Sequence, residues 1–532
     1  MKKGLTRRDA LKLSGLAMGG LAFGGAMIGP GAVSTQANED CACPAEPTCD
    51  WPDKPNRTER YFYFDRLKPF YPFDKSTKTT ICPLGENEMR ITFMGSTIPM
   101  NMRKTQQMMS VFVEVGWDKD KQTPLDQFIF DCGSGVCTNY SAMNVATGRM
   151  NKIFINHLHG DHMSDLTHIY CFGPSQDRKS PLYVFGPKNS GVQSPAWGAN
   201  PAKVYDDGTR AFCENLRRAV RWHTESFSFQ TTSYPGYPSQ EEIQGAWGLK
   251  NLPVPVEDDP WGDSYALVPI ELDWMKYGEV PGDNVAYYNE YKEYYHTTSV
   301  KITHFPVIHT RRGSVGYKLE WKTPSGKTLS MVYTSDTKPE YHSVEQAKGV
   351  DMFIHEMIVP AQVWMMKNDH MDSLPGLDTQ GVQFLQMVQN SSHSPQGAFG
   401  YLLSLIEPRP RLTVATHFPV ANDTVSCAMK SVKEHCNVYQ GKALPQDGKN
   451  PARITWSFDL MVIKVTQKEI VELKGEINDY EFGAKVNLPE GTPNPPKYSN
   501  PDGTGNPYAQ IDTLMQIPSC EDGKCNYRED GY

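Results

Sequence analysis

The sequence feature that most constrains this chain is a cluster of metal-binding residue types near position 160. It reads Asn156-His157-Leu158-His159-Gly160-Asp161-His162 and follows the short apolar run 152–155. Three imidazoles and one carboxylate within six residues provide the nitrogen and oxygen donors that zinc-type ions prefer. Because a turn after a strand directs neighbouring side chains to different points, the cluster predicts a centre for two divalent metal ions.

The composition is that of a globular protein with a net negative charge. Of the 532 residues, 39% are hydrophobic and 21% are charged, which is enough apolar mass for a large core. The mean hydropathy of -0.52 and the lack of a long apolar run in the body exclude a polytopic membrane protein. Lys and Arg number 53, Asp and Glu 61, and the net charge is -8. Because an acidic chain lacks a general attraction to phosphate backbones, we expect no nucleic-acid partner.

Residues 1–37 are typical of an export signal. The pair Arg7-Arg8 precedes a Gly- and Ala-rich apolar stretch that runs to about Ile28, and the segment ends at Ala37. This order resembles the twin-arginine export signal. We therefore expect the twin-arginine export machinery as a partner and a periplasmic or secreted location. No lipid-attachment motif follows the signal, so a stable membrane anchor is not expected.

The rest of the chain divides by composition into three parts, the second of which contains an insertion. Residues 38–88 are Pro- and aromatic-rich and are predicted to form an N-terminal arm. A domain of short strands and turns is predicted over 89–470, and the Pro-rich residues 471–532 form a C-terminal tail. Residues 188–299 show little periodicity and are too long for an ordinary loop, which predicts a lid insertion. Strands are predicted at 90–94, 110–115, 127–131, 152–155, 182–185, 299–303, 314–321, 329–334, 351–354, 412–415 and 458–465.

Three more candidate ligands follow predicted strands far downstream. His309 precedes the Gly-Tyr strand 314–321, Asp336 follows 329–334, and His417 follows 412–415. His304, five residues before His309, is the alternative for the first of these positions.

Together these motifs resemble the metallo-β-lactamase superfamily, and in particular its ribonuclease Z and arylsulfatase branch. The resemblance implies a four-layered αβ/βα sandwich, an α/β fold, carrying the lid insertion. It implies seven ligands: His157, His159 and His309 for one metal, Asp161, His162 and His417 for the other, and Asp336 as the bridge. Zinc is predicted, with manganese and iron as alternatives. The stretches 61–68, 161–173, 180–187 and 221–234 also resemble exported guanitoxin-biosynthesis-type hydrolases of this fold.

The resemblance also implies residues for proton transfer. Glu356, in Ile354-His355-Glu356, resembles the glutamate of that branch, and His393 resembles the histidine that pairs with it and protonates the leaving oxygen. Such a pair works as a general acid because the carboxylate fixes the tautomer of the ring and raises its pKa. A structural His–Glu pair is the alternative. Asp161 or Asp336 is expected to orient the nucleophile.

The predicted function is hydrolysis of an ester-type bond by a hydroxide that bridges two metals. The ester is a phosphodiester, sulfate ester or lactone of a small organic substrate, which the aromatic residues of the insertion bind. Ribonuclease Z carries a basic arm for tRNA, whereas 188–299 is aromatic and acidic here, so RNA is not expected. The alternatives are a ribonuclease Z-like phosphodiesterase or endonuclease, a metal-dependent transferase or lyase, and a non-catalytic metal-binding protein.

Overall fold

The computed structural model describes most of the predicted domain. The described residues are 67–72, 82–98, 104–176, 178, 181–193, 204–227, 266–276, 278–279, 298–368, 376–418, 425, 428, 431–432, 434–436, 454–477, 520–521 and 524–525. The predicted export signal lies outside these residues, as does most of the predicted tail. Within these ranges no helix has the length and apolar character needed to cross a membrane.

The described core of the molecule contains two large sheets. The first has the strand order β1-β16-β15-β2-β3-β4-β5-β6-β7. Its strands are β1 (Lys68–Phe70), β2 (Met89–Gly95), β3 (Ser110–Val115), β4 (Asp126–Phe130), β5 (Lys152–Phe154), β6 (Leu182–Pro187), β7 (Leu267–Leu272), β15 (Met461–Val465) and β16 (Ile470–Gly475). The second has the order β14-β13-β12-β11-β10-β9-β8. Its strands are β8 (Gly278–Glu279), β9 (Val300–Pro306), β10 (Val315–Lys322), β11 (Thr328–Tyr333), β12 (Met352–Glu356), β13 (Leu412–Thr416) and β14 (Ile454–Trp456).

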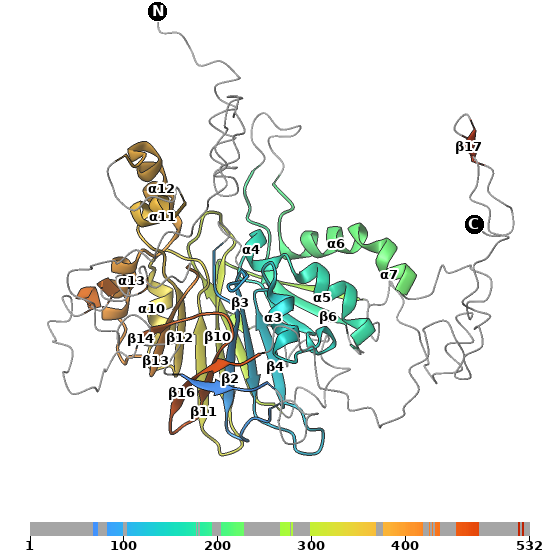
Figure 1. The fold of residues 1–532 in the computed structure, drawn as a ribbon, viewed down its shortest axis with the longest axis horizontal. Helices are drawn as coiled ribbons and strands as arrows, with labels where there is room; N and C mark the ends of the chain where they lie inside the picture. The colour runs from blue at the N-terminus through green and yellow to red at the C-terminus, as the bar shows by residue number, and fades with distance from the viewer. Residues whose placement is uncertain are drawn as a thin grey trace, which may run out of the picture.

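Helices cover the outer face of each sheet, so that the molecule has four layers (Figure 1). On the first sheet lie α3 (Val136–Ala142), α4 (Gly160–Met163), α5 (Leu166–Phe172), α6 (Thr209–Ala219) and α7 (Arg221–Phe227). On the second lie α10 (Tyr341–Ala347) and α13 (Gln396–Ser404), with α11 (Ala361–Asn368) and α12 (Thr379–Ser392) beyond them.

The central core lies between the two sheets and takes alternate residues from each. Ile91 and Phe93 of β2 and Tyr317 and Leu319 of β10 are fully buried in this one cluster. Residues of opposite parity, such as Phe112 of β3, belong instead to a second cluster under α3 and α5. Successive residues of a strand point to opposite faces, so a sheet covered on both sides places apolar side chains in two cores. Burial of each large apolar side chain contributes about 1.5–3 kcal/mol to the free energy of folding. The predicted αβ/βα sandwich is confirmed.

The sheets extend past the predicted domain boundaries. β1, in the predicted arm, pairs in parallel with β16, and β16 runs beyond the predicted end at 470 into the predicted tail. Part of the predicted lid is also scaffold, because β7 is the edge strand beside β6 and Cys213 of α6 is buried in the cluster below it. The alternating pattern of β7 is short and contains a proline, so it does not stand out from the aromatic sequence around it.

The carboxyl ends of several parallel strands meet at one edge of the sandwich. β4 and β5 are parallel neighbours in the first sheet, and β11, β12 and β13 are parallel neighbours in the second. Asn156 joins the sheets there, since its Nδ2 donates to Thr334 O at 2.8 Å and its carbonyl accepts from Val315 N at 3.1 Å. Polar residues that follow these strands are therefore brought together, as ligand sites commonly are in α/β sheets.

Candidate metal centre

The first group of converging side chains consists of three histidines. His157 and His159 lie in the turn after β5, and His309 lies in the loop between β9 and β10. His157 Nε2 lies 2.9 Å from His159 Nδ1, and His159 Nδ1 lies 3.2 Å from His309 Nε2. Tetrahedral ligands about 2.0–2.1 Å from a zinc ion lie about 3.3 Å from one another, so these nitrogens have nearly the spacing of a metal site.

The second group combines two carboxylates with two imidazoles, all buried. His162 Nε2 lies 3.2 Å from Asp161 Oδ2 and 3.4 Å from Asp336 Oδ1. His417 Nε2 lies 3.2 Å and 3.3 Å from the same two oxygens. Both His162 Nε2 and Asp336 Oδ1 are buried without a hydrogen-bond partner. Because unsatisfied buried polar atoms are costly, a shared cation is the partner that this arrangement fits.

Asp336 connects the two groups. Its Oδ1 faces His162 and His417, whereas its Oδ2 lies 3.7 Å from His309 Nε2 in the first group. One carboxylate therefore presents one oxygen to each cluster. An anionic bridge of this kind offsets the repulsion between two divalent ions about 3.5–4 Å apart.

The far nitrogens of the histidines are held by hydrogen bonds. His157 Nδ1 lies 2.9 Å from Asn156 Oδ1, and His309 Nδ1 lies 2.9 Å from Ser392 O. His162 Nδ1 lies 2.8 Å from Asp131 Oδ2. Each such bond fixes the tautomer that leaves the inward nitrogen with a lone pair for a metal.

Asp131 is the functional residue that sequence reasoning missed. Its Oδ2 also accepts from Tyr333 Oη at 2.6 Å and from Ser335 Oγ at 2.9 Å, and its Oδ1 accepts from Asn156 N at 2.8 Å. In the sequence, Asp131 ends a predicted strand, and Asp336 likewise lies at the carboxyl end of one, so this position is the signal that could have identified Asp131. Asp131 therefore orients His162 while it ties together segments from both sheets.

The backbone is strained at three positions around this edge. Asp131, Ser335 and His417 have φ values of 57°, 53° and 59°, in the left-handed region that non-glycine residues seldom adopt. Each such residue costs about 1–3 kcal/mol and persists where the surroundings enforce it, most often at functional sites.

Burial and charge set the protonation of the cluster. Burial lowers the pKa of His309 to about 3, so this ring stays neutral and available as a ligand. Burial also favours the neutral form of His162, but the negative charges of Asp161, Asp336 and Asp131 outweigh it and raise the pKa of His162 well above its usual value. The negative charge of these buried carboxylates therefore favours the binding of divalent metal ions.

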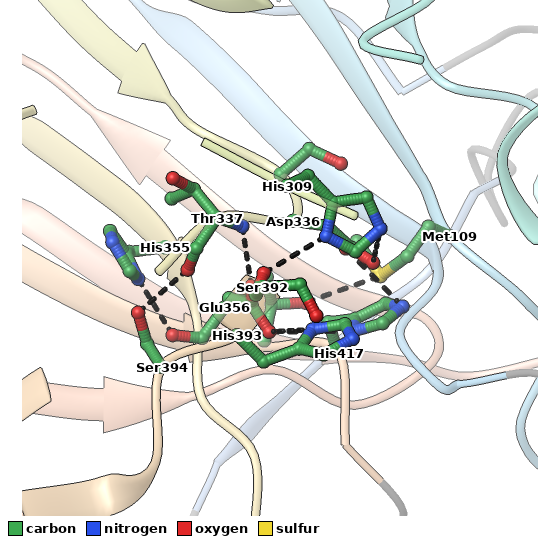
Figure 2. Close-up of polar contacts among 12 residues, drawn as sticks. Met109, His309, Asp336, Thr337, His355, Glu356, Ser392, His393, Ser394 and His417 are labelled. Atoms are coloured by element: carbon green, nitrogen blue, oxygen red, sulfur yellow. Dashed lines mark hydrogen bonds and ion pairs between the residues drawn. The ribbon is translucent and has the colours of Figure 1, made fainter. Parts of the chain in front are cut away.

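Glu356 and His393 form a buried pair that lies against both clusters, with Glu356 Oε2 at 3.9 Å from His417 Nδ1 (Figure 2). Glu356 Oε2 accepts from His393 Nδ1 at 2.8 Å, and its Oε1 accepts from Thr337 N. Burial disfavours the charged ring of His393, but Glu356 outweighs this effect and raises the pKa of His393 to about 9. The His393 ring lies 4.8 Å, centroid to centroid, from that of His309, so the pair adjoins the first cluster.

His304 and His355 lie outside the two clusters of candidate ligands. His304 Nε2 lies 3.2 Å from Asp273 O, and His304 belongs to neither cluster, so His309 occupies the position for which both competed. His355 donates from Nδ1 to Glu356 O at 2.7 Å and stacks on Phe399. The structure thus brings the seven predicted ligands together in two adjoining clusters: His157, His159, His309, Asp161, His162, Asp336 and His417.

Comparison with known proteins gives relatives of one kind. No family model matches the chain. Ribonuclease Z of Halalkalibacterium halodurans is 25% identical over 235 residues, which are 43% of this chain and 65% of the relative, so the match spans less than two thirds of that protein. Ribonuclease BN of Proteus mirabilis is 24% identical over 270 residues, 50% of this chain and 76% of the relative.

Two solved structures are also similar to part of this chain. The metallo-β-lactamase fold protein YhfI from Bacillus subtilis is 11% identical, with a TM-score of 0.38, over 71% of this chain and 100% of that chain. The short form of human tRNase Z is 18% identical, with a TM-score of 0.37, over 70% of this chain and 98% of that chain.

Two packed sheets with outer helices and a His/Asp centre at one edge define a protein of the metallo-β-lactamase fold. Within that fold, the chain is similar in sequence to ribonucleases Z and BN, which places the resemblance in the ribonuclease Z branch. The predicted recognition is confirmed at this level. The narrower resemblance to guanitoxin-biosynthesis-type hydrolases stays a prediction.

These relatives also overturn one expectation. They are ribonucleases by name, so the prediction of a small organic substrate with no nucleic-acid partner is wrong. The expectation rested on the net charge and on the acidic, aromatic character of residues 188–299. A total of -8 sums over the whole chain and says nothing about the local charge at the rim of the site.

Proposed function

We propose that this chain is a metal-dependent hydrolase of phosphodiester bonds whose substrate is RNA. The observation that carries the proposal is the pair of His/Asp clusters sharing Asp336, in a chain similar to ribonucleases Z and BN. The buried Glu356–His393 pair beside those clusters favours an enzyme over a non-catalytic metal-binding protein, because it can supply a proton to a leaving group.

Two zinc ions fit the donor set best. The first cluster offers three imidazole nitrogens, and the second offers two imidazoles and two carboxylates, which are the ligands typical of zinc. His157, His159 and His309 would hold one ion, and Asp161, His162 and His417 the other, with Asp336 between them. Bound there, such ions supply Lewis-acid stabilisation of phosphoryl oxygens and lower the pKa of water.

The chain's own residues supply position and protons. Asp161 Oδ2, at 3.2 Å from both His162 Nε2 and His417 Nε2, is placed to accept a hydrogen bond from the attacking water and orient it. His393 Nδ1 is engaged by Glu356, so its Nε2 is the nitrogen left to deliver a proton to the departing oxygen. Glu356 is in turn fixed by Thr337 N, which follows Asp336 directly.

The test is elemental analysis of the purified protein together with an assay on RNA and on bis-p-nitrophenyl phosphate. We expect about two zinc ions per chain, cleavage of RNA, and loss of both activities with a chelator. Hydrolysis in oxygen-18 water must place the label in the product, which separates it from transfer or lyase chemistry. Metal-loaded protein that cleaves neither substrate would refute the proposal.

Replacing His393 with alanine is expected to lower kcat for RNA cleavage about 10²- to 10⁴-fold, with metal content unchanged. Glu356→Gln removes the charge that raises the pKa of His393. Because the protonated ring is the active form, activity falls as pH rises through its pKa, and Glu356→Gln should move that alkaline limb to lower pH. A pH–kcat profile measures this. An unshifted limb in the glutamine variant would make the pair structural.

We also propose that residues 1–37 direct export by the twin-arginine route. The Arg7→Lys, Arg8→Lys double variant keeps the charge but removes the paired arginines, and we expect it to remain in the cytoplasmic fraction. The matched control is Lys2→Arg, which should reach the periplasm like the wild type. Immunoblots of fractionated cells check this, and equal export of all three proteins would argue against the assignment.

A further inference from the structure

The loops that carry His309 and Asp336 are joined into one rim beside the metal centre. Ile308 N donates to Thr337 Oγ1 at 3.0 Å, and Lys338 N donates to Ile308 O at 2.9 Å. Residues 308–312 and 337–338 are called the cation rim below. Thr310 is exposed, and its Oγ1 lies 3.3 Å from His309 Nε2, the nitrogen that faces the first cluster. The cation rim therefore lies where the centre meets solvent.

One arginine of the cation rim is neutralised and acts as an anchor. Arg311 forms an ion pair with Asp207, its Nε lies 3.4 Å from Ser190 Oγ, and its guanidinium lies 5.2 Å from the centroid of the Tyr205 ring. Asp207 also accepts from Ser190 N at 2.8 Å. These contacts fix the loop after His309 against the segment that follows β6.

Two other cations of the rim have no carboxylate partner. Arg312 is exposed and Lys338 is half-buried, and across the described ranges neither forms an ion pair. Glu340, the acid next to Lys338 in sequence, is engaged at the start of α10, where it accepts from His342 N at 2.5 Å and from Ser343 N at 2.6 Å. Among the described residues, two positive charges without an ion-pair partner thus lie on the loops that carry His309 and Asp336, in a chain whose net charge is -8.

We propose that Arg312 and Lys338 bind the phosphates that flank the scissile bond of an RNA strand. The proposal rests on the function proposed above and names the surface that holds its substrate. A lone phosphodiester is held by the centre itself, whereas a polynucleotide carries further charges on either side that cations outside the centre can meet. Contacts from Arg and Lys to phosphate fix the register of a nucleic acid without reading its sequence.

The experiment compares wild type with the Arg312→Gln, Lys338→Gln double variant, both as the full metal-loaded chain. We expect kcat/KM for a single-stranded RNA to fall about 5- to 20-fold at low salt, well beyond any change with bis-p-nitrophenyl phosphate. The slope of log(kcat/KM) against log salt should become shallower by about 1.4, since each phosphate contact contributes about 0.7. Binding is measured independently by fluorescence anisotropy of labelled RNA, with His393→Ala in both proteins to slow cleavage while metal content is kept.

The matched control is Lys327→Gln, in the turn between β10 and β11. This exposed lysine lies at the far end of those strands, since Lys322 pairs with Thr328 there and Tyr317 pairs with Tyr333 nearer the site. We expect wild-type RNA affinity and salt slope from it. If the wild type cleaves RNA and the double variant behaves like this control, phosphate binding by Arg312 and Lys338 is refuted while the proposed function stands. A wild type that neither cleaves nor binds RNA would overturn the proposed function and the rim together.

Discussion

Replacing Asp336 with asparagine is expected to lower kcat for RNA cleavage by about 10³-fold or more, which is about 4 kcal/mol of transition-state stabilisation. The carboxylate presents one oxygen to each cluster, with Oδ1 at 3.4 Å from His162 Nε2 and Oδ2 at 3.7 Å from His309 Nε2. An amide offers one oxygen and no charge. It neither bridges two ions nor offsets their repulsion, so we expect bound zinc to fall from about two ions per chain towards one.

Bound zinc, by elemental analysis, and kcat are measured on the same preparation. A missing bridge lowers both the zinc content and kcat, whereas a missing proton donor lowers kcat alone. Asp120→Asn is the matched control, since it makes the same change in an exposed turn between β3 and β4, away from the strand ends that carry the clusters. That variant should keep both zinc and activity. Two ions and a kcat within tenfold of wild type in Asp336→Asn would show that Asp336 is not the bridge.

The ligand set was predictable because each member has a local signature. His157 and His159 belong to one short motif, and Asp336 and His417 each follow an apolar strand. The carboxyl ends of parallel strands in a sheet share one edge, so residues in that position meet even when they are far apart in sequence. Local pattern alone left His304 as an alternative to His309, and the family resemblance favoured His309; in the structure His304 lies within β9 and His309 follows it.

The support around the ligands was much less predictable. Asp131 receives hydrogen bonds from Asn156, His162, Tyr333 and Ser335, and the last two lie more than two hundred positions away in sequence. No local pattern records such contacts, because they depend on how two sheets are packed. The same holds for the proposed phosphate contacts, since Arg312 and Lys338 lie on two loops that are distant in sequence and are joined by hydrogen bonds in the folded chain.

A second large effect is expected from the buried ion pair at the base of β5. Lys152 Nζ contacts Asp126 Oδ1, and their side chains are 1% and 0% exposed. Removing one partner leaves the other charge buried without compensation, so Asp126→Asn or Lys152→Met should each lower the free energy of unfolding by about 3–5 kcal/mol. Urea unfolding followed by circular dichroism measures the change.

The double variant Asp126→Leu, Lys152→Met removes both charges, and we expect it to recover most of the lost stability, because apolar side chains of similar volume need no solvation. Lys119→Met breaks the exposed pair with Glu86 and should leave the urea midpoint unchanged. Single variants as stable as wild type would show that the pair is not a buried charge pair. β5 leads directly into the turn that carries His157, so zinc binding should weaken in the single variants and return in the double variant.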